Sequence, residues 1–327
     1  MRAAVISEPG GPEVFRIQDI EDPVPGPEDV LVDVRATALN RADLLQRRGR
    51  YNGPPGIRDD VPGLEMAGVV AAVGKRVDTV APGARVFGLL GGGGYAQRVV
   101  THHRMVTTIP DNLSFTDAAA IPEVFITAYD ALFNHCDLSM GEAALIHAAG
   151  SGVGTAAIQL AHHAGATTFG TAGSAEKLSK AADLGLDVGI NYQSEDFAEV
   201  IKERTQSRGV DVVLDVIGAS YWERNLASLV VQGRMVIVGT LGGATLETNL
   251  GTLMFKRLRV HGTTLRMRPL EEKIAVTQQF KNHVLPLLTD GRVRPIVDRV
   301  LPLEEVSEAH RYMESNANFG KIVLSME

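Results

Sequence analysis

The sequence contains little of what marks several protein classes. Its 327 residues include one cysteine, Cys136, and one tryptophan, and only 5% are aromatic. A single cysteine excludes an intramolecular disulfide framework and a cysteine-rich metal lobe. The formal net charge of −7 provides no basic field for nucleic acid or anionic lipid. No run of eighteen apolar residues occurs, and the first residues turn polar too early for a signal peptide. We therefore expect a soluble, cytoplasmic protein that binds neither nucleic acid nor a membrane.

The pattern of the chain changes near Glu123. Up to residue 122, short valine-rich segments separated by glycine and proline are typical of a β domain. From 123 to 262, strand-like and helix-like segments alternate, which indicates a doubly wound parallel sheet. Residues 263–327 return to strand, helix and strand. We therefore predict an α/β protein, in which a Rossmann domain (123–262) is inserted in a β-rich domain (1–122 with 263–327).

Apolar runs and capping residues give the expected elements of the inserted domain. They predict strands at 143–149, 166–171, 211–218, 233–240 and 258–265, a helix at 154–165, and a helix at 174–185 that Ser174 caps.

A glycine-rich turn, "HAAGSGVGTAA", lies between the first strand and the first helix of this domain. Gly150, Gly152 and Gly154 would allow a tight turn and the approach of a pyrophosphate to the helix N-terminus. The spacing is not G-x-G-x-x-G, so the strand–turn–helix context carries the prediction, and a turn without ligand is the alternative. Gly218 and Gly239 end later strands and would lie at the same edge of the sheet.

The next strand ends in "FGTAGSAEKL" and lacks the acid that often binds the adenosine ribose. An acid there would repel a 2′-phosphate, whereas Gly173 leaves room for it and Ser174 can donate to it. Lys177 and the helix N-terminus add positive charge. This pattern favours NADPH over NADH. Alternatively, Ser174 is only a helix cap and Lys177 a solvated residue.

Several long motifs resemble the zinc-free quinone oxidoreductases of the medium-chain dehydrogenase/reductase superfamily, the relatives of zeta-crystallin. They include "ALNRADLLQRRGRY", "PGLEMAG", "AAAIPE", "HAAGSGVGTAAIQLA", "TAGSAEKL" and "EAHRYMESNANFGKIVL". The subgroup that includes the tumour-suppressor-inducible quinone oxidoreductase of animals looks most similar. The resemblance implies a GroES-like β-rich catalytic domain, a Rossmann cofactor domain, NADPH and a homodimer.

The resemblance also implies positions for the cofactor contacts. The phosphate turn reads "AAGSGVG" where "AASGGVG" is commoner, which leaves its peptide donors open. The expected contacts, with the strand-end glycines included, are Thr127, Gly150, Ser151, Gly152, Val153, Gly173, Ser174, Lys177, Tyr192, Gly218, Gly239, Thr240, Leu241, Thr263, Thr264, Leu265 and Asn318.

The positions that bind catalytic zinc in zinc-dependent relatives hold other residues here. Aligned by motif, they read Asn40, Leu64 and Glu123. Catalytic zinc needs three ligands from His, Cys or carboxylate, and only one carboxylate remains, so we expect no metal. The adjacent pairs His102–His103 and His162–His163 offer no substitute, because neighbouring side chains point in different directions on a strand or helix.

Without zinc, hydride has to reach an acceptor that is already electron-poor. A quinone meets this requirement, because its reduction gives a phenolate that water can protonate. Asn40 and Tyr51 are the expected substrate residues; the alternatives are a turn-closing Asn and a loop-anchoring Tyr. Glu65 is expected to be a buried acid paired with a nearby base, and Arg41 and Asp43 to stabilise the fold.

Two other functions stay open. An NADPH-dependent alkenal or enoyl reductase would use the same hydride geometry on a conjugated carbonyl but needs a proton donor, for which Tyr51 is the one candidate. A non-catalytic nucleotide- or RNA-binding protein is a third possibility, against which the acidic net charge weighs.

Overall fold

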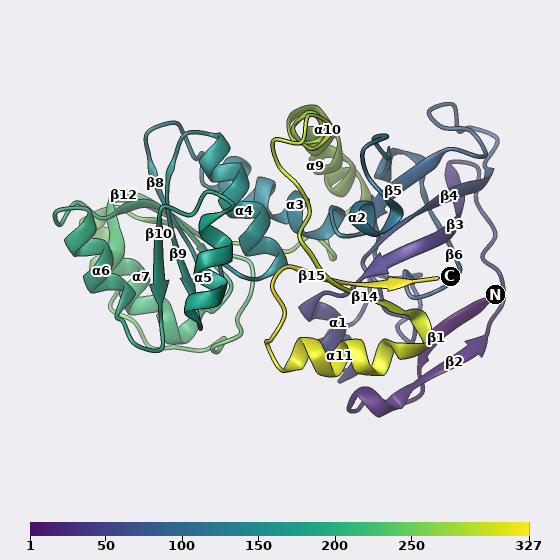
Figure 1. Ribbon diagram of the computed structural model, residues 1–327, viewed down its shortest axis with the longest axis horizontal. Coiled ribbons are helices and arrows are strands. Elements are labelled where there is room, and N and C mark those ends of the chain that lie inside the picture. Colours follow the sequence, from purple (N-terminus) through teal and green to yellow (C-terminus); the bar gives the residue numbers. More distant parts are fainter. Residues whose placement is uncertain (327) are drawn as a thin grey trace. The chain divides into compact units, whose positions relative to one another are not determined.

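The computed structural model describes residues 1–326, which form two compact units (Figure 1). Unit 1 comprises Met1–Ile126 and the chain from Leu265 onward, and unit 2 comprises Thr127–Thr264. The division falls after residues 126 and 264, whereas the sequence pattern places it after 122 and 262. Two features account for the difference. Helix α3 (Pro122–Tyr129) runs across the first boundary, and the Thr263 N–H still donates to Ile237 O of the unit 2 sheet.

Unit 2 contains a six-stranded sheet in which every neighbouring pair is parallel. The predicted doubly wound sheet is therefore confirmed. Its strands are β8 (Ala143–Ile146), β9 (Thr167–Ala172), β10 (Val188–Asn191), β11 (Val210–Asp215), β12 (Leu229–Ile237) and β13 (Arg259–Gly262), in the order β10-β9-β8-β11-β12-β13.

Helices cover both faces of this sheet, with α4 and α5 on one side and α6 and α7 on the other (Figure 1). Leu145, Phe169 and Val213 point to one face and form a core with Phe197 of α6 and Leu226 of α7. The unit 2 helices are α4 (Gly152–His163), α5 (Ala175–Ala182), α6 (Phe197–Arg204), α7 (Trp222–Ser228) and α8 (Leu250–Lys256), with a π-helix at Asp130–His135 and a 3-10 turn at Ala219–Tyr221.

Local hydrogen bonds set the element ends that differ from expectation. Helix α4 begins at Gly152, two residues earlier than expected, because Ser151 caps it. Strand β11 ends at Asp215 rather than at residue 218. The Asp215 carboxylate accepts hydrogen bonds from the N–H groups of Ile217 and Gly218, which turns the chain out of the sheet.

Unit 1 is built around a seven-stranded sheet. Its strands, with the β1-β2 hairpin, are β1 (Arg2–Ile6), β2 (Phe15–Asp19), β3 (Asp29–Ala38), β4 (Glu65–Val73), β5 (Arg85–Leu89), β6 (Arg98–His102), β7 (Val106–Thr108), β14 (Val297–Pro302) and β15 (Lys321–Ser325). The order is β14-β15-β3-β4-β5-β7, and β6 also pairs with β3. The C-terminal strand β15 therefore completes a sheet that the N-terminal half begins, as predicted for a split domain.

The β-rich core of unit 1 follows from strand alternation. Val30, Val32 and Val34 of β3 point inward and pack with Met66 and Val86 of the neighbouring strands. The helices of unit 1 are α1 (Arg41–Arg47), α2 (Phe115–Ala119), most of α3, α9 (Leu270–His283), α10 (Leu285–Thr289) and α11 (Val306–Glu314), with 3-10 turns at Pro12–Val14, His103–Met105 and Leu303–Glu305. Within residues 1–326, none of the helices has the length and apolar character needed to cross a membrane.

Candidate active site

The glycine turn of unit 2 follows β8, the strand at which the strand order reverses. Strand β9 lies on one side of β8 and β11 on the other. Open parallel sheets bind ligands outside the carboxyl ends of their strands at such a point. Gly150 and Ser151 follow β8, and Gly152 and Val153 form the first turn of α4. The predicted phosphate turn therefore lies where the topology favours a dinucleotide.

Ser151 and Gly154 shape this turn. The Ser151 Oγ accepts a hydrogen bond of 2.9 Å from the Gly154 N–H. A Cβ on Gly154 would lie 2.2 Å from Ala148 O, so glycine is needed for the helix to begin this close to the strand. Ser151 thus occupies the Gly154 donor, which leaves the earlier N–H groups of the helix for an anion.

The predicted 2′-phosphate residues follow β9. The Ser174 Oγ accepts from the Lys177 N–H at 3.3 Å, which confirms the expected cap. A Cβ on Gly173 would lie 2.6 Å from the Tyr192 hydroxyl. Tyr192 therefore takes the room that Gly173 leaves. Lys177 is half-buried one turn further along α5. The sequence predicts that Gly173 leaves its space to a 2′-phosphate, whereas here the Tyr192 hydroxyl lies in that space; no acid stands at this strand end.

The loops after β11 and β12 pack against each other at the same edge. Gly218 has a φ of 81°, and a Cβ there would lie 2.6 Å from Gly243 O and 3.2 Å from Thr240 Cα. The Leu241 N–H donates to Val216 O at 3.1 Å. Gly218, Gly239, Thr240 and Leu241 therefore belong to one carboxyl-edge cluster.

The remaining predicted contacts divide between the units. Thr127, Thr263 and Thr264 belong to unit 2, whereas Leu265 and Asn318 belong to unit 1. Asn318 is buried, and its Nδ2 donates to Gly320 O at 2.8 Å. The roles of all these residues toward a cofactor stay predictions.

A buried polar cluster in unit 1 surrounds Asn40. The Lys321 ammonium donates to Glu65 Oε1 and Asn40 Oδ1, each at 2.7 Å, and to Leu39 O at 2.6 Å. Asn40 Nδ2 donates to the same Glu65 oxygen at 2.9 Å and to Ala38 O at 3.3 Å. Glu65 is thus the buried, base-paired acid that the sequence predicts. The Asn40 amide, predicted to contact substrate, has protein partners at both its oxygen and its nitrogen.

Asp43 and Arg41 stabilise the fold through different partners. The buried Asp43 carboxylate accepts from the Asn40 N–H at 2.7 Å and from the Tyr95 hydroxyl at 2.9 Å. Burial raises the pKa of Asp43 to about 6. Arg41 instead donates to Asn316 Oδ1. Asp43 thereby fixes the start of α1, directly beside Asn40.

Tyr51 lies on a loop that Arg266 holds. The guanidinium stacks on the Tyr51 ring, 5.0 Å from its centroid, and donates to Tyr51 O at 3.2 Å and Gly91 O at 2.8 Å. Arg266 is only 3% exposed, and its Nη2 has no hydrogen-bond partner within the described residues. Burial, with a contribution from the Glu123 carboxylate, raises the pKa of Tyr51.

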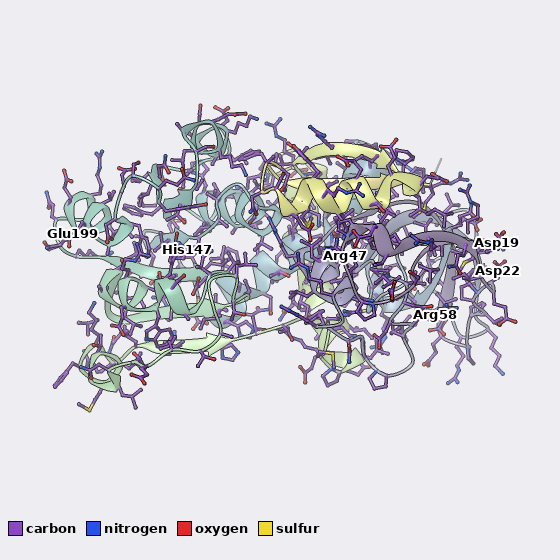
Figure 2. The ribbon with its side chains drawn as sticks, turned by 90° about the horizontal axis from the view of Figure 1, so that it is seen from below. Asp19, Asp22, Arg47, Arg58, His147 and Glu199 are labelled. Atoms are coloured by element: carbon purple, nitrogen blue, oxygen red, sulfur yellow. The ribbon has the colours of Figure 1, made fainter. Side chains whose placement is uncertain are left out.

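The histidines have structural rather than ligating surroundings. His147 is buried inside unit 2 (Figure 2), between Thr171 Oγ1 at 3.0 Å and Asn225 Oδ1 at 2.7 Å, and burial lowers its pKa to about 4. The expectation that His102 and His103 point apart is wrong, because their rings stack at 4.8 Å. Strand alternation does not apply, since β6 ends at His102 and a 3-10 turn begins at His103. Among residues 1–326, no group of three His, Cys, Asp or Glu side chains could hold a metal.

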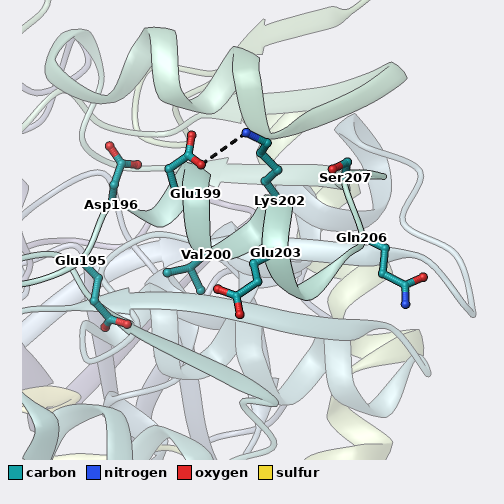
Figure 3. A pocket seen from close by; sticks show the side chains of 8 residues that line it. All are labelled: Glu195, Asp196, Glu199, Val200, Lys202, Glu203, Gln206 and Ser207. Carbon is teal, nitrogen blue, oxygen red and sulfur yellow. Dashed lines mark hydrogen bonds and ion pairs between the residues drawn. The ribbon is translucent and has the colours of Figure 1, made fainter.

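A surface hollow on unit 2 is unrelated to these residues. It is lined by α6 and its flanks, with Glu195, Asp196, Glu199, Glu203 and the Glu199–Lys202 ion pair (Figure 3). None of the predicted site residues lines it.

Comparison with known proteins places this arrangement in a family. Residues 26–111 match the model of the alcohol dehydrogenase GroES-like domain, and residues 152–288 match that of the zinc-binding dehydrogenases. Quinone oxidoreductase of Lama guanicoe is 34% identical over 330 residues, which cover 100% of this chain and 98% of that protein. The chain belongs to the quinone oxidoreductase family. It is therefore an oxidoreductase of the medium-chain dehydrogenase/reductase superfamily, and the expected GroES-like domain is confirmed.

Solved structures agree over the full length of this oxidoreductase. Escherichia coli quinone oxidoreductase complexed with NADPH has a TM-score of 0.88 at 31% identity, over 99% of this chain and 100% of that one. An NAD-dependent alcohol dehydrogenase has a TM-score of 0.90 at 34% identity and covers 100% of both chains. The two neighbours differ in the cofactor that their descriptions name, so the nucleotide has to be argued from residues.

Reasoning from the sequence of this quinone oxidoreductase family member missed two residues of the candidate site. Lys321 lies in the apolar segment "FGKIVL". A single lysine among apolar residues is the one sign in the sequence that its charge is buried. Arg266 follows the last strand of unit 2 without any motif. Both act on residues more than 200 positions away in the sequence, so local patterns do not reveal their partners.

The Lys321–Glu65 pair gives a stability prediction. We expect Lys321→Met to lower the free energy of unfolding by about 3–5 kcal/mol, because it leaves the Glu65 charge buried without its partner. The matched control is Lys180→Met, which removes an exposed pair with Glu176 worth about 0.3–0.5 kcal/mol. Urea unfolding at neutral pH measures both. Equal losses would contradict a special role for the buried pair.

Proposed function

We propose that this oxidoreductase transfers hydride from NADPH to quinones without zinc, and that it does so in the cytoplasm. The observation that carries the proposal is the Lys321 ammonium, which occupies the Asn40 oxygen and one Glu65 oxygen. Leu64 provides no ligand. Of the three positions aligned with zinc ligands, only Glu123 then offers a donor, because an ammonium ion already engages the Asn40 oxygen, whereas catalytic zinc needs three protein ligands.

Residues of unit 2 support NADPH as the nucleotide. The first turn of α4 would hold the pyrophosphate, and Ser174, Lys177 and Tyr192 would hold the 2′-phosphate. When bound, NADPH supplies the hydride. The missing acid after β9 removes the repulsion that a 2′-phosphate would otherwise meet. The NADPH complex of the Escherichia coli relative supports the same choice.

A quinone suits a site without a Lewis acid. Accepting hydride makes it an aromatic phenolate, so the acceptor itself provides the driving force. The residues of unit 1 then have to orient the ring and exclude water. Tyr51, held by Arg266, is the aromatic side chain that we assign to this task.

We further propose a homodimer. Helix α8 exposes Leu250, Met254 and Phe255, which are 68%, 66% and 80% exposed. The first two are one turn apart on the helix and form an apolar face with Phe255. Strand β13, next in the chain, is an edge of the unit 2 sheet. A second copy of the chain would cover this apolar surface.

The reaction itself is tested with three acceptors. NADPH oxidation is followed at 340 nm with 1,2-naphthoquinone, an alkenal and an enoyl thioester. We expect the quinone to give the highest kcat/KM. Turnover of the thioester or alkenal without turnover of the quinone would contradict the proposal and identify a double-bond reductase.

The cofactor assignment is tested at Lys177. We expect Lys177→Ala to weaken NADPH binding by roughly 10–100-fold, because one charged hydrogen bond to the phosphate is lost. NADH binding should change little. Isothermal titration of both nucleotides measures this, with Lys180→Ala as the control from the next turn of α5. Equal losses for the two nucleotides would show that Lys177 does not contact the 2′-phosphate.

The homodimer is tested by sedimentation. The native protein should sediment at twice its chain mass of 35.0 kDa. Phe255→Asp should give monomers because it places a charge in the apolar face. Val24→Asp, which changes a residue that is 87% exposed on unit 1, should leave the dimer intact. A native monomer, or a dimer that survives Phe255→Asp, would contradict this interface.

A further inference from the structure

Three carboxyl groups lie close together in unit 1, and two of them are already engaged. Glu65 accepts hydrogen bonds on both oxygens, from Lys321 and Asn40 on one and from the Glu123 N–H on the other. Asp43 accepts from Asn40 and from a tyrosine hydroxyl. Asp43 Oδ1 has no hydrogen-bond partner within the described residues, but both side chains are fully buried, so neither can reach a substrate.

The third carboxyl group, that of Glu123, is placed differently. Glu123 is the second residue of α3, and its backbone N–H donates to Glu65 Oε2 at 2.8 Å. Its side chain is half-buried rather than fully enclosed, and its carboxyl makes no hydrogen bond within the described part of the chain. The backbone is thus anchored while the acid group stays available.

The charges around Glu123 favour its protonated form. Glu65 on β4 and Asp43 on α1 repel its carboxylate, while Lys321 on β15 and Arg266 attract it. Lys321 has already committed its three N–H groups, so it provides no direct partner. Burial and the Glu65 charge raise the pKa of Glu123 to about 8. These surroundings favour the protonated carboxyl of Glu123.

Glu123 also belongs with the residues expected to contact substrate. Glu65 links it to Asn40, since the two bind opposite oxygens of one carboxylate. The Glu123 charge also contributes to raising the pKa of the Tyr51 phenol. Arg266, which stacks on Tyr51, has an unpartnered and buried Nη2 that could bind an oxygen anion.

We propose that Glu123 is the proton donor that completes substrate reduction. The inference rests on the proposed function. A quinone that has accepted hydride is a hydroquinone monoanion; its oxygen takes the proton as the Glu123 O–H bond breaks and a phenol O–H bond forms. The carboxylate regains a proton from water before the next turnover. Two electrons and two hydrogens are thus transferred, one as hydride and one as proton.

Tyr51, the one donor named by sequence, is the weaker acid of the two. Its pKa is raised above the ordinary value of 10.0, whereas a donor works best with a pKa near the operating pH. Tyr51 then packs against substrate, and Glu123 delivers the proton.

A pH profile of the NADPH-loaded enzyme tests the proposal. For the native protein we expect kcat/KM with 1,2-naphthoquinone to fall as the pH rises through about 8, where Glu123 loses its proton. Glu123→Gln should lower kcat at pH 7 on the order of 10²-fold and abolish the fall in kcat/KM at high pH. Glu123→Asp should restore part of the rate and keep a fall in kcat/KM at high pH. Glu271→Gln, which changes an exposed acid of unit 1, should leave the profile unchanged.

A second readout is independent of turnover. Carbon-13 NMR of glutamate carboxyls in the free protein should show one signal that titrates near pH 8 and is missing in Glu123→Gln. The raised pKa also predicts that the native protein loses stability relative to Glu123→Gln as the pH rises from about 4.5 to about 8, because the charged form is disfavoured only in the folded state.

An unchanged profile in Glu123→Gln, or titration of its signal near 4.5, would overturn the proposal. A native enzyme inactive on quinones but active on an alkenal would instead overturn the proposed function. In that case the same profile, measured with the alkenal, still decides whether Glu123 is the donor.

Discussion

The buried ion pair of Lys321 and Glu65 is the interaction on which unit 1 depends. It joins strand β15 near the C-terminus to strand β4, and through Asn40 to the start of α1. Bringing two charges out of water is costly, and the cost is met only when every donor and acceptor finds a partner. The lysine uses all three N–H groups, and the carboxylate accepts three bonds in all. The pair therefore ties β15, β4 and the start of both α1 and α3 together.

The two units offer different kinds of groups to a ligand. Unit 2 relies on backbone: a helix N-terminus, a glycine that lets the helix approach its strand, and loops packed at the carboxyl edge of the sheet. Unit 1 relies on side chains with shifted acidity. Its buried acids Glu65 and Asp43 hold the fold, and we assign the chemistry to Glu123 and the Tyr51–Arg266 pair. A nucleotide needs many peptide donors, whereas a proton needs one group of suitable pKa.

Features encoded by neighbouring residues could be predicted from the sequence. The parallel sheet, the glycine turn and the Ser174 cap each depend on residues within a few positions of one another. The expected orientation of His102 and His103 was wrong. Strand β6 ends between these two residues, so the alternation of side chains along a strand does not apply to them.

The sequence by itself therefore determined the architecture and the family, and it predicted the nucleotide-binding segments. Only the tertiary structure decided which base pairs with Glu65 and that Arg266 holds Tyr51, and only it shows the surroundings that raise the pKa of Glu123. The reason is physical. The acidity of a buried group is set by desolvation and by charges within a few ångströms, and here those charges come from strands and helices far apart in the chain.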